Sequence, residues 1–158
     1  MYPDSSEGLN KETDDAVYFF TPAFHVLDSF SAHTITLWGK TFPTAEHAFQ
    51  WKKFCIAAPD VAKKIFTAGS PEAAKRIAIE NKATVLPEWY IHRASVMREV
   101  LTAKAEQHED VREQVKKTGN RTIIENSPVD SFWGCGPDGK GENTIGKIWM
   151  EIRAKLIQ

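Results

Sequence analysis

A glutamate, a glutamine and a lysine recur at helical spacing in a strongly apolar segment. At about 100° of rotation per residue, Glu46, Gln50 and Lys53 fall on one narrow stripe of a helix that begins just after Pro43. The rest of this helix is apolar around most of its circumference, which predicts that it is buried. Because burial of ionisable groups is costly unless they are paired, the stripe indicates a site that offers a carboxylate, an amide and an ammonium group.

A glycine-rich segment precedes the last predicted helix and is the second unusual feature. Such a backbone is free to expose its N–H groups, and it runs into a helix N-terminus, where aligned peptide dipoles favour an anion. One hypothesis is therefore that Gly139, Lys140, Gly141 and Asn143 hold a phosphate. The alternative is an exposed turn in which Asn143 or Thr144 simply caps the helix.

Asp130 and Trp133 stand three residues apart just before this loop. A carboxylate beside an aromatic ring that stacks on a sugar or a base is a common arrangement for the cleavage of glycosidic bonds. Each residue also has a simpler interpretation, since an aspartate is often a turn residue and a tryptophan often belongs to the core. For Glu46 the simpler interpretation is a first-turn acid that complements the helix dipole.

The elements that position these side chains follow from caps, breakers and periodicity. The expected helices begin at serine, threonine or proline residues and end near glycine residues. Short runs of β-branched or aromatic residues mark the expected strands. The strands are expected at 17–20, 34–38, 41–42 and 121–125, with Gly39-Lys40 as a hairpin turn. The helices are expected at 44–56, 59–67, 88–107, 109–117 and 144–156, with another that starts at Ser70-Pro71. The predicted fold is α+β: one mostly helical domain with a few short strands over residues 16–158, after a flexible tail at 1–15.

The composition excludes several classes of protein. Twenty basic and 21 acidic residues give a net charge of −1, which argues against a general electrostatic grip on nucleic acid. Cys55 and Cys135 form no ligand cluster with the five histidines, so we expect neither a disulfide framework nor a metal or other cofactor. The first fifteen residues have neither the basic start nor the apolar stretch of a signal peptide, so we expect none, and no apolar run approaches the roughly 18 residues that suggest a membrane span. We expect a cytoplasmic protein; its oligomeric state is left open.

Two long motifs, in order, carry a resemblance to a known family. They are Phe42–Gln50 with Lys53-Phe54, and Asp130-x-x-Trp133-Gly134-x-Gly136 with Gly139-x-Gly141-x-Asn143-x-x-Gly146. Ser70-Pro71, Trp89, Val96-Met97 and Trp149-Met150-Glu151-x-Arg153 support them. From Val17 onwards the chain resembles the NADAR (YbiA-like) family.

The resemblance implies hydrolysis of N-glycosidic bonds. One branch of the family cleaves ribosylamino-pyrimidine 5′-phosphate intermediates of riboflavin synthesis, and another removes ADP-ribose from modified guanine bases, which would include a modified base in nucleic acid. The family's functional residues correspond to Glu46, Trp89, Asp130 and Trp133, with Lys53 as an addition. Glu46 is expected to activate water or to stabilise the oxocarbenium-like carbon, and Asp130 to orient sugar hydroxyls or to share the acid–base work.

The remaining expectations concern substrate contacts. Trp89 and Trp133 are expected to stack on the base, Gln50 to contact the substrate, and Lys53 with the glycine loop to hold phosphate. Lys53 lies about 10.5 Å along the helix axis from Glu46, so we expect a phosphate contact rather than a direct pKa partner. Ser29 replaces a usual asparagine of the family, which places one substrate contact in doubt.

Several residues are expected to lie outside the site, and two alternatives to an enzyme remain. His47 points away from the stripe and is expected to be structural or exposed, while Trp38 and Trp51 are expected in the core. No histidine at a suggestive spacing supports Cys135 as a nucleophile. A binding module that recognises ADP-ribose or a nucleotide without cleaving it is one alternative to an enzyme, and an interaction protein whose stripe forms internal salt bridges is another. The carboxylate pair weighs against the binding module, because a pure binder of an anion needs no carboxylate.

Overall fold

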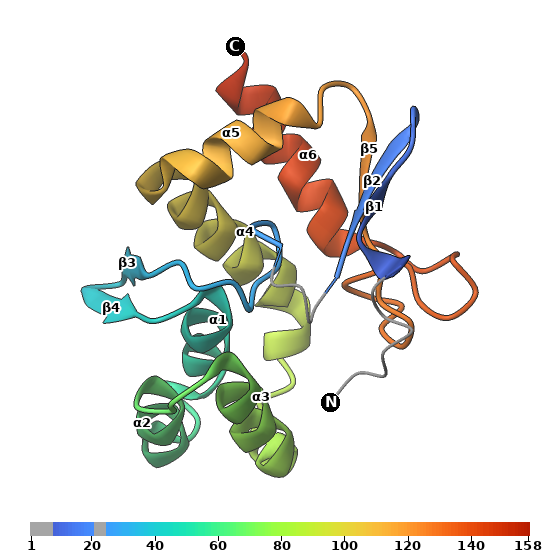
Figure 1. Cartoon of the computed structure of the whole chain (residues 1–158). Coiled ribbons are helices and arrows are strands. Elements are labelled where there is room, and N and C mark those ends of the chain that lie inside the picture. Colours follow the sequence, from blue (N-terminus) through green and yellow to red (C-terminus); the bar gives the residue numbers. More distant parts are fainter. Residues whose placement is uncertain (1–7, 21–24) are drawn as a thin grey trace. The chain divides into compact units, whose positions relative to one another are not determined.

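The computed structural model describes residues 8–20 and 25–158, which form two compact units (Figure 1). One unit contains the described residues up to Ser31 together with His108–Gln158, and the other is Ala32–Gln107. The described residues hold six α-helices and five short strands. The predicted α+β class with mostly helical content is confirmed.

The first unit is built on a three-stranded sheet with the order β1-β2-β5. β2 (Ala16–Phe19) runs parallel to β5 (Thr122–Glu125), and β1 (Lys11–Glu12) is antiparallel to β2. β2 is almost entirely buried because its side chains are mostly apolar and it is the central strand. Figure 1 shows the three strands side by side.

Part of the segment predicted as a tail belongs to this sheet. Beyond the β1 pairing, the Asn10 side-chain amide donates to the Phe20 carbonyl oxygen (2.8 Å) and accepts from the Phe20 N–H (2.9 Å). The Asn10 side chain therefore provides the hydrogen-bond partners of Phe20, a residue that the backbone of β1 does not pair with. Residues 1–7 of the predicted tail lie outside the described part of the chain.

Helices α5 (Glu109–Lys117) and α6 (Thr144–Leu156) complete the first unit. α6 packs on β5 so closely that a Cβ on Gly146 would collide with the Ile123 carbonyl oxygen. Trp149 of α6 is fully buried, and its indole N–H donates to the Leu27 carbonyl oxygen at 2.9 Å. This bond satisfies the buried indole and ties the turn around Leu27 to the helix.

Helix α1 (Ala45–Phe54) is the centre of the second unit. It contacts α2 (Pro59–Phe66), α3 (Pro71–Glu80) and α4 (Trp89–Gln107), and a short 3₁₀ turn, η2, lies at Lys82–Thr84. The Thr44 hydroxyl caps α1 by accepting from the His47 N–H, as the sequence predicts. Phe54 packs with apolar residues of α2 and α3, so the helix is surrounded on most sides.

The hairpin of the second unit differs from its prediction in the position of its turn. β3 (Ile35–Leu37) pairs with β4 (Lys40–Phe42), which leaves Trp38-Gly39 as the two-residue turn instead of Gly39-Lys40. Both residues have positive φ, 54° and 74°, which suits the twist of a tight hairpin. The sequence suggested glycine as the turn residue but not that a tryptophan would share the strained conformation.

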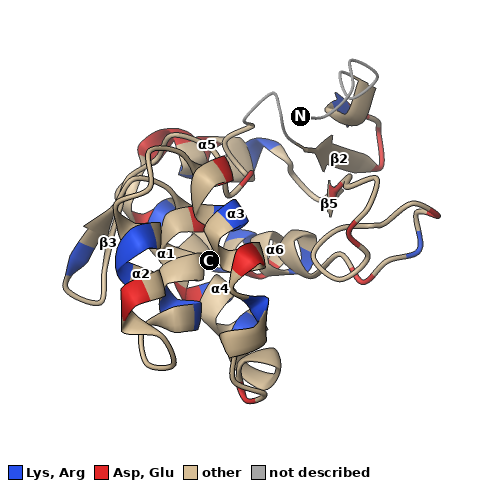
Figure 2. Ribbon diagram, turned by 90° about the horizontal axis from the view of Figure 1, so that it is seen from below, with Lys and Arg blue, Asp and Glu red and all other residues tan. Residues whose placement is uncertain are grey.

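Charges of both signs are interspersed along the helices of both units (Figure 2). This distribution matches the near-zero net charge of the whole chain. Within the described residues, no helix combines the length and the apolar character needed to cross a membrane.

Candidate functional site

Glu46 is buried in the first turn of α1 and is held there by Gln50. Glu46 and Gln50 are only 6% and 7% exposed, and Gln50 Nε2 donates to Glu46 Oε1 at 2.8 Å. A carboxylate oxygen can only accept, so the amide nitrogen rather than the amide oxygen must face it. The contact thus fixes the orientation of both side chains.

This orientation leaves the other end of the Gln50 amide open. Gln50 Oε1 is buried and accepts no hydrogen bond from any residue of the described chain. Buried polar atoms nearly always have a partner, and the exceptions concentrate where a water or a ligand is missing. Gln50 therefore presents an acceptor next to the Glu46 carboxylate, as a site for water or a hydroxyl group requires.

Lys53 stands at the far end of the same stripe and is half-buried. Burial lowers the pKa of its ammonium, the charge of Glu46 raises it, and the charges of Arg93 and Lys82 lower it further. The charge of Glu46 therefore acts on Lys53 along the stripe, and the contact of Lys53 with phosphate stays a prediction.

Arg93 and Lys82 add positive charge beside Lys53, and sequence reasoning missed both. Arg93 comes from α4 and Lys82 from η2, so only the packing of unit 2 brings the three cations together. Arg93 follows Trp89 by four residues, which places the two on one face of α4. This four-residue spacing from Trp89 is the sequence signal from which Arg93 could have been identified. Trp89 itself is buried and packs on Phe49 of α1, with ring centroids 5.1 Å apart.

His47 is structural, as predicted. Its ring is 1% exposed, with Nε2 2.9 Å from the Ala68 carbonyl oxygen and Nδ1 2.8 Å from the Thr44 hydroxyl. Because a carbonyl only accepts, Nε2 carries the proton and Nδ1 accepts from Thr44. The imidazole links the start of α1 to the turn between α2 and α3, and both of its nitrogens are occupied.

Asp130 organises its own loop in the first unit. Asp130 Oδ1 accepts the N–H groups of Phe132 (2.9 Å) and Trp133 (2.7 Å), so the carboxylate caps a turn. The Trp133 ring is half-buried and meets Phe132 edge to face, with centroids 4.7 Å apart. The Asp130 carboxylate and the Trp133 indole therefore belong to the same turn.

The backbone N–H groups of the glycine loop donate hydrogen bonds to acceptors in the same loop. Those of Gly139, Gly141 and Asn143 donate to the carbonyl oxygens of Gly136, Cys135 and Gly134, and that of Lys140 donates to Asp138 Oδ1. The first helical N–H groups, of Thr144 and Ile145, donate to Phe132 and Trp133. A backbone cradle for an anion would have to break these bonds, so any phosphate contact from this loop would come from a side chain.

Asn143 joins the loop to the sheet. It lies in the left-handed region at φ 53°, its Nδ2 donates to the Ile123 carbonyl oxygen at 2.8 Å, and its Oδ1 accepts from the Glu125 N–H at 2.9 Å. Its side chain thus fastens β5 instead of capping α6. Ser29, the departure from the family pattern, is buried in the same unit.

Three further residues have their outcomes in the structure. Cys135 is buried, and burial raises the pKa of its thiol, which keeps it in the unreactive protonated form. Trp38 and Trp51 are half-buried instead of fully buried, and Trp51 packs against the edge of the hydrophobic core around Phe54. Their rings stack on each other at the outside of α1, with centroids 6.2 Å apart.

Comparisons with known proteins agree along nearly the whole chain. The NADAR domain family model matches residues 10–157. The chain is 33% identical to the N-glycosidase Npun_R5314 of Nostoc punctiforme over 89% of this chain and 92% of that protein. It is 35% identical to the N-glycosidase YbiA of Escherichia coli over 81% of this chain and 79% of that protein. The NMR structure of E. coli YbiA superposes with a TM-score of 0.79 and 30% identity, covering 94% of this chain and 89% of that one.

One relative has a different name and a greater length. The riboflavin biosynthesis protein VVA0006 of Vibrio vulnificus is 33% identical over 90% of this chain, which corresponds to 39% of that protein. This chain therefore matches one part of a larger protein whose name refers to riboflavin biosynthesis.

Proposed function

Because this chain belongs to the NADAR domain family, we propose that it is an N-glycosidase that hydrolyses the bond between a phosphorylated ribose and a base. We further propose that the substrate is a ribosylamino-pyrimidine 5′-phosphate intermediate of riboflavin biosynthesis. The observation that carries the proposal is the near full-length likeness to two proteins named N-glycosidases. The relative named for riboflavin biosynthesis supports the substrate class.

The reaction needs a water, a base and a proton donor. The oxygen of water forms a bond to the anomeric carbon while the bond from that carbon to the base nitrogen breaks. The nitrogen keeps the bonding electron pair and receives a proton, and the water loses one. A carboxylate close to the anomeric carbon serves both to accept the proton of water and to stabilise the positive charge that develops on the sugar.

Glu46 is suited to this role by its contact with Gln50. Gln50 Nε2 donates to one oxygen of the carboxylate and so holds the group in a fixed orientation. Gln50 Oε1 offers a second acceptor to the same water or to a sugar hydroxyl. A nucleophilic water held by two acceptors is oriented before the reaction begins, which lowers the entropic part of the barrier.

Lys53 is proposed to hold the 5′-phosphate. Besides burial, the charges of Arg93 and Lys82 are close enough to lower the pKa of its ammonium group, whereas the charge of Glu46 favours the protonated form. A phosphate dianion would offset the effect of these positive charges on Lys53 through charge-assisted hydrogen bonds. Bound phosphate also keeps Lys53 protonated, because it opposes the effect of burial.

Asp130, Trp133 and Trp89 enter the proposal through the family resemblance. Asp130 is proposed to orient sugar hydroxyls through the carboxylate oxygen that does not cap its own turn. The two indoles are proposed to contact the base. Stacking on a ring face tolerates different bases, so the polar groups, rather than the rings, would set the preference for one substrate.

A product assay tests the proposal. The protein is incubated separately with a ribosylamino-pyrimidine 5′-phosphate and with ADP-ribosyl guanosine, and free ribose 5-phosphate or ADP-ribose is measured. We expect ribose 5-phosphate from the first substrate. Release of ADP-ribose alone would transfer the activity to the other substrate class, and saturable binding without either product would identify a binding module. Glu80→Gln, an exposed carboxylate of α3, is the matched control for variants of Glu46.

A further inference from the structure

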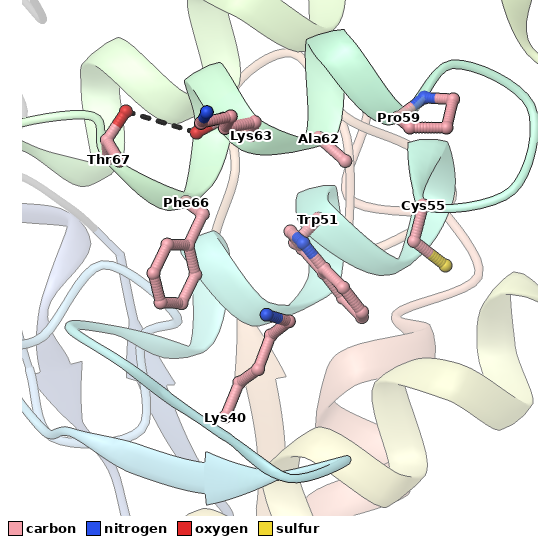
Figure 3. A pocket seen from close by; sticks show the side chains of 8 residues that line it. All are labelled: Lys40, Trp51, Cys55, Pro59, Ala62, Lys63, Phe66 and Thr67. Carbon is pink, nitrogen blue, oxygen red and sulfur yellow. Dashed lines mark hydrogen bonds between the residues drawn. The ribbon is translucent and has the colours of Figure 1, made fainter.

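A pocket lies against α1, away from the Glu46 stripe. Trp51 is about 140° around the helix from Glu46, at about 100° per residue. The pocket has a volume of about 480 Å³, within the range of small-molecule sites. Its lining comes from the hairpin, α1 and α2 and includes Lys40, Trp51, Cys55, Ala62, Lys63 and Phe66 (Figure 3).

The walls of this pocket are aromatic and held in place from behind. The Trp51 ring is stacked on Trp38 at 6.2 Å with an angle of 24° between the planes. Phe66 meets the buried Phe42 edge to face at 5.5 Å, and Phe42 also contacts Trp51. Rings supported in this way cannot collapse into the pocket, so two flat apolar surfaces stay available beside it.

The charge beside these rings has one sign. Lys40 Nζ lies 5.6 Å from the ring centroid of Trp51 and 5.2 Å from that of Phe66, and Figure 3 shows this side chain reaching between the two rings. Lys63 of α2 is a second basic residue in the lining. Among the described residues, no carboxylate lines the pocket to balance these charges. The surroundings therefore combine ring faces with a positive potential.

We propose that this pocket binds a planar aromatic anion, that is, a ring that carries a carboxylate or a phosphate. The ring would stack against Trp51 and Phe66, while the anionic group would pair with Lys40 and Lys63. A neutral ring would give the two lysines no anionic partner, and an anion without a ring would make no stacking contact with the aromatic walls. This inference does not depend on the proposed N-glycosidase activity.

Three simple probes test the ligand chemistry by calorimetric titration. They are 2-naphthoate, the neutral 2-naphthylmethanol of similar shape, and cyclohexanecarboxylate, which has the charge without the aromatic ring. We expect 2-naphthoate to bind in a 1:1 ratio and each control to bind at least about five-fold more weakly, since a desolvated cation–π or ion-pair contact contributes on the order of 1 kcal/mol. Equal affinity for the neutral probe, or no saturable binding of 2-naphthoate, would overturn the proposal.

Paired variants locate the binding. Lys40→Ala should weaken 2-naphthoate binding by about three- to ten-fold. Lys64→Ala removes a neighbouring exposed lysine that does not line the pocket and should leave the affinity unchanged. Lys40 is exposed, so its removal leaves the fold intact. Equal losses in both variants would mean non-specific attraction, and loss of binding in Glu46→Gln would assign the ligand to the other face of α1. Either result refutes this site.

Cys55 provides an independent readout of position. Its thiol lines the pocket, whereas Cys135 is buried and the pKa of its thiol is raised by burial. Iodoacetamide should therefore label Cys55 first. Bound 2-naphthoate should slow the labelling of Cys55 several-fold, and it should slow it less in Lys40→Ala. Labelling that is unchanged at saturating 2-naphthoate would contradict the location.

Discussion

Two helix starts in this chain carry unusual residues, and they use them in opposite ways. At α1 the backbone is capped by Thr44, and the side chains of Glu46 and Gln50 are left to act, with Gln50 Oε1 lacking a partner in the described chain. At α6 the preceding glycine loop consumes its N–H groups in bonds within the loop. A region that keeps a buried polar atom unsatisfied is a better candidate for chemistry than one that satisfies all of its groups.

The glycines before α6 gain a structural explanation from the same comparison. A Cβ on Gly134 would lie 2.6 Å from the Glu125 carbonyl oxygen, and one on Gly141 would lie 2.6 Å from the Gly134 carbonyl oxygen. These positions need glycine because backbone passes close to backbone. Glycine-rich composition thus indicates close packing here as readily as it indicates an anion site.

The largest effect is expected at Glu46. Glu46→Gln keeps the shape and the Gln50 contact partner but removes the base, so kcat/KM for ribose 5-phosphate release should fall by about 10²- to 10⁴-fold. The melting temperature, measured beside Glu80→Gln, separates lost chemistry from lost folding. Activity within two-fold of the unmodified protein would remove Glu46 from the mechanism.

The largest effect on the glycine side is expected in stability. Gly146→Ala forces a Cβ into the Ile123 carbonyl oxygen and should lower the free energy of unfolding by about 3 kcal/mol, the upper part of the overpacking range. Gly69→Ala has open space around its Cβ and is the matched control. Urea unfolding of both variants measures the difference, and equal stabilities would show that α6 shifts away from β5 at little cost.

Gln50 tests whether the open amide matters to the reaction. Gln50→Leu removes both the donor to Glu46 and the free acceptor, so kcat should fall by about 10- to 50-fold while KM changes little, as for a group that positions the reacting water. Gln50→Asn, which keeps the amide on a shorter chain, should retain part of the activity. An equal rise in KM and no change in kcat would make Gln50 a binding residue only.

Lys53 tests the phosphate assignment. Lys53→Met should raise KM for the phosphorylated substrate by about ten-fold and leave the hydrolysis of the corresponding dephosphorylated nucleoside unchanged, because a charge-assisted hydrogen bond contributes about 1.5 kcal/mol. Steady-state kinetics with the two substrates measure the split. Equal losses on both substrates would place Lys53 at the reacting centre instead of at the phosphate.

Lys53→Met, which should weaken substrate binding, should at the same time stabilise the fold. Burial holds the pKa of Lys53 below its ordinary value of 10.5, so between the lowered pKa and 10.5 the unfolded chain binds more protons than the folded chain. Stability from this group therefore rises with pH across that window, and at pH 7 the charged form is a cost. Lys53→Met should raise the melting temperature at pH 7, with the gain shrinking towards pH 10.5.

The smallest effect is expected at Lys140. This side chain is exposed and its backbone N–H is already bonded to Asp138, so Lys140→Ala should change KM by less than about three-fold, as a surface charge does. The comparison with Lys53→Met is direct, because each removes one ammonium group. A larger change at Lys140 than at Lys53 would move the phosphate to the glycine loop and reverse the contrast between the two helix starts.

Local signals predicted most of the fold. The Thr44 cap, the Ser70-Pro71 start and the hydrophobic periodicity placed the helices within one or two residues of their observed bounds. The two-residue strand β1 escaped detection because a short polar strand has no periodic pattern, and its pairing with β2 is a tertiary contact. The turn at Trp38-Gly39 was misplaced by one residue, since the register of a hairpin is decided by both strands together.

The sequence by itself determined the stripe, because helical spacing alone places Glu46, Gln50 and Lys53 on one face. Only the tertiary structure decided what those groups do. Packing of α4 and η2 brings Arg93 and Lys82 beside Lys53, and burial leaves Gln50 Oε1 without a partner among the described residues. Packing of the glycine loop on itself and on β5 closes its N–H groups to a ligand. Spacing along one helix is a local property, whereas the partners of a buried group come from segments distant in the chain.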